Sequence, residues 1–174
     1  VSRLKEHDVA EAIEKEILKI IEEKIDKVQG IIISDFVYGC VTPNVLSGIQ
    51  VMAKKHGVNL YGDLQCSSQV GNVLRFTDFF AIFPTEREVR IALGNKSDGV
   101  EYLAKKVFET ARCKNLVFKF GAEGFVSYSR GVRADSREHF PALVSDPVDV
   151  SGAGDALLAT MSLFLAGGAT LTEA

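Results

Sequence analysis

The feature that most constrains this chain is a series of short apolar runs without polar alternation, separated by stretches with helical periodicity. The runs cover residues 30–34, 58–61, 79–83 and 116–120. A strand that is apolar on both sides is typical of a parallel sheet that helices cover on both faces. The alternation therefore predicts an α/β fold, with three layers (α/β/α) around a mainly parallel sheet that has right-handed crossovers.

The expected helices begin at recognisable start signals. Asp8 with Glu11 resembles a capping pair, and Pro43 is well suited to the first position of a helix because it has no N–H to satisfy. A further strand is expected at 125–128, with short edge strands and loops over 129–148. The helices are expected at residues 9–28, 43–55, 86–93, 97–113 and 156–168.

Composition limits the functional classes that remain open. The chain has 174 residues, of which 47% are hydrophobic and 25% charged, which suits a single globular domain over residues 1–174. A net charge of -3 argues against a nucleic-acid partner. Cys40, Cys66 and Cys113 have no metal-binding or disulfide spacing, so we expect a reducing cytoplasm. No signal peptide is visible, and the longest apolar run is too short for a membrane span.

Polar residues follow several of the expected strands. Asp35, Asp63, residues 85–88 and residues 119–124 all occupy this position. Ligands of open parallel sheets bind beyond the carboxyl ends of the strands. Each residue taken alone could be a loop residue or a helix cap, but their common position favours one shared ligand site.

The segment 149–168, DVSGAGDALLATMSLFLAGG, places glycines and a carboxylate at the start of an apolar helix. Gly152 and Gly154 would let the backbone approach an oxygen-rich ligand, and the N–H groups of a helix start attract anions. Asp155 could then accept the proton of an attacking hydroxyl. Alternatively, Asp155 complements the helix dipole and the glycines allow close packing. These residues alone leave both interpretations open.

The wider context resembles a known family. Residues 149–155, DVSGAGD, are similar to the signature of the ribokinase-like, or PfkB, carbohydrate kinases: an acidic residue, two residues, then GAGD. The segments IFPTEREV and VFKFGAEGFVSYS precede it in the family's order. SRLKEHDVAE and IIISDFVYGCVTP are most similar to the heptose-7-phosphate kinase branch. The resemblance implies a ribokinase-like fold and phosphorylation of a sugar or sugar-phosphate hydroxyl, with ATP and Mg²⁺ as cofactors.

The resemblance also implies roles for individual residues. Asp155 would be the general base, and the loop of Gly152, Ala153 and Gly154 would form the anion hole. Glu88 would help to hold Mg²⁺ through water, and Asp149 would lie near a monovalent cation such as K⁺. The residues that would bind ATP are Lys119, Gly121 and Gly124.

Several positions depart from the family's pattern. Thr85 stands where Asn is usual, and Lys119 stands where Thr is common. The frequent D-P-K segment is Asp63-Leu64-Gln65, so a lysine is lost, and Val37-Tyr38 replaces a Gly-Lys pair. These departures leave a second hypothesis open: a non-catalytic nucleotide-binding module, or a decayed kinase, of the same fold.

The resemblance covers the central and later part of the family's sequence. We expect the N-terminal part with the lid, which supplies most sugar contacts, and the extreme C-terminus to have no counterpart in these residues. The sugar therefore stays undetermined. A homodimer remains possible, and it would use a surface other than the lid.

Overall fold

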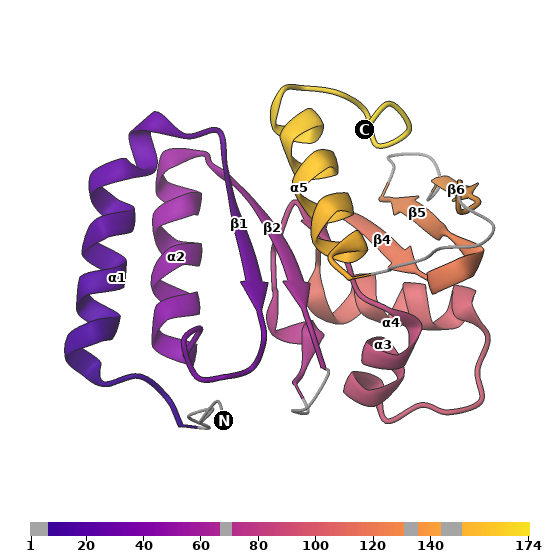
Figure 1. Cartoon of the computed structure of the whole chain (residues 1–174), viewed down its shortest axis with the longest axis horizontal. Coiled ribbons are helices and arrows are strands. Elements are labelled where there is room, and N and C mark those ends of the chain that lie inside the picture. Colours follow the sequence, from indigo (N-terminus) through magenta and orange to yellow (C-terminus); the bar gives the residue numbers. More distant parts are fainter. Residues whose placement is uncertain (1–6, 67–70, 131–135, 144–150) are drawn as a thin grey trace.

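The computed structural model describes residues 7–66, 71–130, 136–143 and 151–174, which form one mixed sheet with flanking helices (Figure 1). The six strands lie in the order β1-β2-β3-β4-β5-β6; the first four are parallel, and the last two continue antiparallel. This arrangement confirms the predicted α/β class. The strands are β1 (Gly30–Asp35), β2 (Asn59–Leu64), β3 (Ala81–Ile82), β4 (Asn115–Lys119), β5 (Phe125–Ser129) and β6 (Ser136–Phe140).

Helices form a layer on each face of the sheet. Four pack on one face, whereas α5 (Ala153–Ala166) covers the other, where it lies in front of the strands in Figure 1. Within the described ranges, no helix is both long and apolar enough to cross a bilayer. The four helices on the first face are α1 (Glu11–Lys24), α2 (Pro43–His56), α3 (Glu86–Leu93) and α4 (Val100–Ala111).

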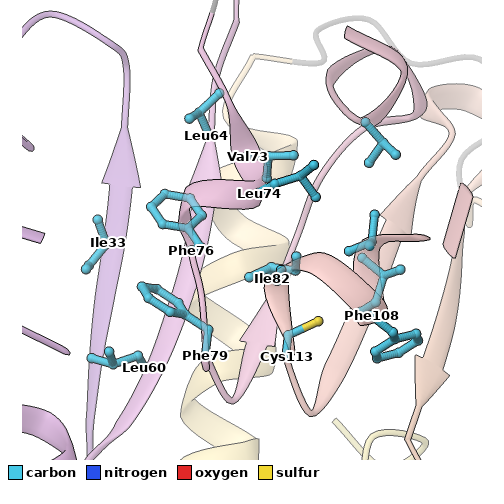
Figure 2. Packing of buried hydrophobic residues seen from close by; sticks show 14 of the residues in the cluster. Ile33, Leu60, Leu64, Val73, Leu74, Phe76, Phe79, Ile82, Phe108 and Cys113 are labelled. Carbon is cyan, nitrogen blue, oxygen red and sulfur yellow. The ribbon is translucent and has the colours of Figure 1, made fainter. Parts of the chain in front are cut away.

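The larger core lies between the sheet and these four helices. Alternate strand residues such as Leu60, Leu64 and Ile82 point into it, together with Phe76 and Phe79 from the segment before β3 (Figure 2). These side chains are almost completely buried. Burial of a large apolar side chain contributes about 1.5–3 kcal/mol, so this cluster is the main source of stability.

The smaller core lies under α5. Tyr61, Ala81 and Val117 point to this face and contact Leu158 and Met161 of the helix. Because side chains alternate along a strand, Asp63 and Lys119, two residues beyond Tyr61 and Val117, point to the same face. The packing that seats α5 therefore also places a carboxylate and an ammonium near the start of this helix.

Two local predictions were wrong. Asp8 does not cap α1: the N-cap is Ala10, which has no side-chain capping bond, and the helix begins at Glu11. The amide of Val9 instead donates to the carbonyl of Gly39, which joins this segment to the loop after β1. The strand β1 is also not buried on both faces, since it lies at the sheet edge and Ile32 remains 45% exposed.

Other elements agree with the sequence, with shifted ends. Pro43 begins α2, and the Thr42 side chain caps it by accepting from the Val45 amide at 3.1 Å. The strand expected over 79–83 is regular only at Ala81–Ile82, because Phe79 and Phe80 pack as an irregular segment before it. β6 falls within the region expected to hold short edge strands.

Candidate functional site

A buried ion pair lies at the carboxyl ends of β2 and β4. The Lys119 Nζ atom donates to both carboxylate oxygens of Asp63, at 2.8 Å each, across the intervening strand β3. Asp63 is completely buried, and its pKa is raised by burial, with the Lys119 charge acting in the opposite direction. Burial of one carboxylate thus requires the nearby cation.

The first turn of α5 lies beside this cation. Gly152 is the N-cap with φ of +77°, a conformation that a side chain would strain, and as a glycine it has no side chain with which to cap the helix. A Cβ atom on Gly154 would be 3.6 Å from the Lys119 Nζ atom, so the ammonium lies against this turn. Uncapped helix N–H groups and a neighbouring positive charge together favour an anion at this position.

Asp155 occupies the third position of the same helix and is exposed. Its Oδ1 atom accepts a hydrogen bond from the Gln65 Nε2 atom at 2.8 Å, across 90 residues of sequence. Its Oδ2 atom has no hydrogen-bond partner within the part of the chain that the structure describes. The carboxylate is therefore oriented through one oxygen and accessible at the other.

Glu88 and Thr85 form a capping box at the start of α3. The Thr85 hydroxyl accepts from the Glu88 amide at 3.3 Å, and the Glu88 Oε2 atom accepts from the Thr85 amide at 2.7 Å. The Glu88 Oε1 atom accepts from the Cys66 amide at 3.3 Å. Each oxygen keeps a further lone pair, so Glu88 could still accept a hydrogen bond from a water molecule of a bound Mg²⁺ ion.

Among the described residues, no three potential ligands from His, Cys, Asp or Glu gather closely enough to form a protein metal cage. Asp63 nevertheless interacts electrostatically with both Glu88 and Asp155, so three carboxylates share one region. Mg²⁺ commonly binds through one or two carboxylates, water and substrate phosphates. The donor set fits such an ion, which a bound nucleotide would bring with it.

The two glycines of the 121–124 turn serve different structural needs. Gly121 has φ of +61° with open space around it, whereas Gly124 has φ of +90° and close neighbours. A Cβ atom on Gly124 would lie only 2.0 Å from the Phe140 carbonyl oxygen. The glycine at 124 is therefore required by the close approach of β6, and the one at 121 leaves the backbone accessible.

A cavity of about 650 Å³ adjoins this turn and the start of α3. Four cationic side chains line it, and two of them, Arg90 and Lys96, lie outside the segments that the sequence predicts for the ligand site. Arg90 pairs with Glu86 at 2.6 Å, but its Nη1 atom is buried and has no partner among the residues described. The lining includes Thr85, Arg87, Arg90, Lys96, Lys119 and Gly121.

One residue named from the sequence does not join this cluster. Asp35 accepts from the Val37 amide at 2.9 Å and pairs with Arg75 at 3.1 Å, on the sheet face opposite Asp63. It therefore stabilises the loop after β1. Asp149 lies outside the described residues. Gln65 was noted only as a departure from a lysine, because no local pattern could show that it meets Asp155.

Comparison with known proteins identifies the family of this chain. A model of the "pfkB family carbohydrate kinase" matches residues 6–174. Bifunctional protein HldE of Geobacter sulfurreducens is 27% identical over 158 residues, which cover 89% of this chain and 31% of that protein. HldE of a Caulobacter species is 29% identical over 175 residues, covering 99% and 35%. The chain thus spans roughly a third of the length of these curated relatives.

Solved structures share the fold. Phosphofructokinase-2 from Escherichia coli in complex with potassium aligns with a TM-score of 0.71 at 18% identity, over 89% of this chain and 50% of that one. Arabidopsis thaliana ribokinase complexed with ribose and ATP aligns with a TM-score of 0.70 at 17% identity, over 87% and 47%. The matching family model covers nearly all of the sequence, and the chain therefore belongs to the pfkB family of carbohydrate kinases.

Proposed function

We propose that this chain carries the phosphoryl-transfer site of an ATP-dependent kinase that acts on a hydroxyl of a sugar or sugar phosphate. The observation that carries the proposal is the position of Asp155: an accessible carboxylate in the uncapped first turn of α5, with the Lys119 ammonium beside that turn. A carboxylate placed next to an anion site is suited to accept a proton from a group that attacks phosphorus.

In this mechanism Asp155 is the general base. The sugar hydroxyl oxygen bonds to the γ-phosphorus of ATP, the bond from that phosphorus to the ADP oxygen breaks, and the hydroxyl proton passes to Asp155. The Oδ2 atom suits this step because Gln65 occupies only Oδ1. Proton transfer to a positioned base contributes about 10²–10⁴-fold to a rate.

The backbone at residues 152–154 serves as the anion hole. Negative charge spreads over the oxygens of the transferring phosphoryl group, and the N–H groups at the start of α5 are held in place by the helix. Lys119 adds a positive charge next to this turn. The protein thus stabilises the developing charge with donors that need not reorient.

The cavity beside α3 accommodates the phosphates of the nucleotide. Arg87, Arg90 and Lys96 supply positive charge, and Gly121 lets the backbone come near, while Gly124 holds the turn in shape. Mg²⁺, held through water by Glu88, would neutralise charge on the phosphates when bound. A K⁺-like ion near Asp149 also belongs to the proposal, because a structural neighbour was solved with potassium.

A heptose phosphate is the first substrate to test. Residues 2–11 and 31–43 resemble the heptose-7-phosphate kinase branch, and proteins named HldE are among the curated relatives. The presence of ATP and sugar phosphates in the cytoplasm makes that compartment the expected location.

A non-catalytic nucleotide-binding module is the second candidate. Lys119 is already neutralised by Asp63, and the Thr85 hydroxyl is already used as a helix cap, so two groups near the nucleotide have structural tasks. This candidate predicts nucleotide binding without ADP release when sugars are added.

The deciding experiment measures ADP release from MgATP with a panel of sugars and sugar phosphates that includes heptose 7-phosphate. We expect sugar-dependent release, and a loss of about 10²–10⁴-fold in kcat for Asp155→Asn. Glu16→Gln, an exposed carboxylate on α1, is the matched control and should leave turnover unchanged. Normal turnover in Asp155→Asn would contradict the role of this residue.

A further inference from the structure

The hydrogen bond between Gln65 and Asp155 joins the sheet to the carboxylate at the start of α5. Gln65 follows directly after the last residue of β2, and its amide nitrogen reaches Asp155 Oδ1 at 2.8 Å. It is the one side chain that hydrogen-bonds Asp155 within the described part of the chain. A geometric role for Gln65 would depend on how firmly the glutamine itself is held.

The backbone around Gln65 is fixed on three sides. The Gln65 amide donates to the Asp35 carbonyl at 2.9 Å, and the next amide, that of Cys66, donates to Glu88 at 3.3 Å. Two residues earlier, Asp63 is held by both hydrogen bonds from Lys119. The sheet therefore fixes the backbone position from which the Gln65 side chain extends toward Asp155.

The chemical nature of the contact matters as well. A primary amide donates an N–H without carrying charge, so it orients a carboxylate and leaves its negative charge intact. The positive charge in this region resides on Lys119, which is paired with Asp63 and not with Asp155. The base thus keeps both its charge and its accessible oxygen.

We propose that Gln65 is a positioning residue for phosphoryl transfer: its amide holds Asp155 through Oδ1 and directs Oδ2 toward the sugar hydroxyl. The inference rests on the proposed function of Asp155 as the base. It assigns to Gln65 an effect on the rate of the chemical step and none on nucleotide binding.

The test compares Gln65→Met, which keeps the length of the side chain but removes the donor, with Gln65→Lys, which restores a donor. For Gln65→Met we expect kcat to fall about 10- to 100-fold, since small misplacements of a reacting group have effects of this size. The KM for MgATP should stay within about twofold. Gln65→Lys should recover only part of kcat, because it restores a donor but its positive charge makes Asp155 a weaker base. Gln29→Met, at an exposed position before β1, is the matched control.

A double-mutant cycle shows whether Gln65 acts through Asp155. In the Asp155→Asn background, Gln65→Met should produce no further loss, whereas independent residues would give additive losses. The side-chain amide NMR signals of Gln65 should also shift when Asp155 is changed to Asn. That measurement reports the contact without any turnover.

Each outcome bears on a different claim. Unchanged kcat in Gln65→Met, additive losses, or amide signals that ignore Asp155→Asn would overturn the role of Gln65 while the kinase proposal stands. An unsubstituted protein that turns over no sugar would overturn the kinase proposal and, with it, this role. A lower kcat with unchanged KM, recovered in part by Gln65→Lys, supports both.

Discussion

The Lys119 ammonium lies 2.8 Å from both carboxylate oxygens of Asp63, although their strands are separated by β3. The pair joins the carboxyl ends of β2 and β4 next to the first turn of α5. It is also nearly dry, since Asp63 is fully buried and the Lys119 side chain is 13% exposed. Removal of one partner should therefore destabilise the protein much more than it would in an exposed ion pair.

Lys119→Met should lower the free energy of unfolding at pH 7 by about 3–5 kcal/mol, because it leaves a buried carboxylate without its counter-charge. Burial raises the pKa of Asp63 and Lys119 opposes this, so the variant raises it further. The pKa of Asp63 is then higher in the folded protein than in the unfolded chain, where it is about 3.8. The free energy of unfolding therefore falls as the pH rises from about 3.8 to the folded-state pKa. Urea unfolding should therefore show a smaller deficit at pH 4 than at pH 7.

The matched control is the double variant Asp63→Asn/Lys119→Met, which removes both charges. It should recover much of the lost stability and lose the pH dependence, since no buried charge is left unpaired. Equal deficits at pH 4 and pH 7 in Lys119→Met would show that lost packing, and not the charge, explains the effect.

The capping box allows the structural and the proposed metal role of Glu88 to be separated. Thr85→Ala removes the hydroxyl that accepts from the Glu88 amide and should cost about 1 kcal/mol in urea unfolding. Glu88→Gln keeps one oxygen for the Thr85 amide but turns its NH₂ group toward the Cys66 amide, so we expect a loss of similar size, about 1 kcal/mol. The same variant should raise the Mg²⁺ concentration needed for half-maximal ADP release. An unchanged Mg²⁺ requirement would remove Glu88 from the metal site.

Gly124→Ala should be much more damaging than Gly57→Ala. Both glycines have positive φ, which costs an alanine about 1–2 kcal/mol, but only Gly124 has close neighbours. Its new Cβ atom would lie 2.0 Å from the Phe140 carbonyl oxygen, so β6 must shift away. Melting temperatures and amide exchange of β6 test this difference. Equal effects of the two substitutions would mean that β6 tolerates the displacement.

The Cys113 thiol should be protected in the native protein. Burial raises its pKa from 9.0 to about 12, whereas Cys40 is exposed. Iodoacetamide at pH 8 should label Cys40, and mass spectrometry should find Cys113 labelled only in denaturant. Fast native labelling of Cys113 would indicate frequent opening of the core around α4.

The same thiol predicts alkaline destabilisation. The unfolded chain loses this proton from pH 9.0 upward and the folded chain does not, so stability should fall by about 1.4 kcal/mol per pH unit above pH 9. Tyr128, whose pKa burial also raises to about 12, contributes only above pH 10.0. Cys113→Ala should therefore flatten the decline between pH 9 and pH 10, as measured by urea unfolding.

Local patterns were sufficient to predict the order of strands and helices. The β-branched run before Asp35 and the Thr42-Pro43 start of α2 express preferences that act over a few residues, and tertiary contacts reinforce them. The prediction that Asp8 caps the first helix was wrong because the Val9 amide donates to the Gly39 carbonyl, which fixes the chain where the helix was expected to begin. The sequence near Asp8 contains no sign of this long-range hydrogen bond.

The candidate site was predictable only where the residues adjoin a motif. Asp155 and its glycines lie within seven residues of sequence, so the pattern itself indicated them. The contacts of Gln65 with Asp155 and of Lys119 with Asp63 span 90 and 56 residues. Arg90 and Lys96 follow no strand end and belong to no motif, so only the fold shows that they line the same cavity.

The seating of α5 on Tyr61, Ala81 and Val117 has a consequence for protein engineering. Asp155 lies about one turn before Leu158, so the height of its carboxylate above the sheet is determined by apolar packing in which it takes no part. A larger side chain at Ala81, which is completely buried, would lift or tilt the helix. Core substitutions under α5 can therefore change the position of the Asp155 carboxylate relative to the sheet, although no polar residue of the site is replaced.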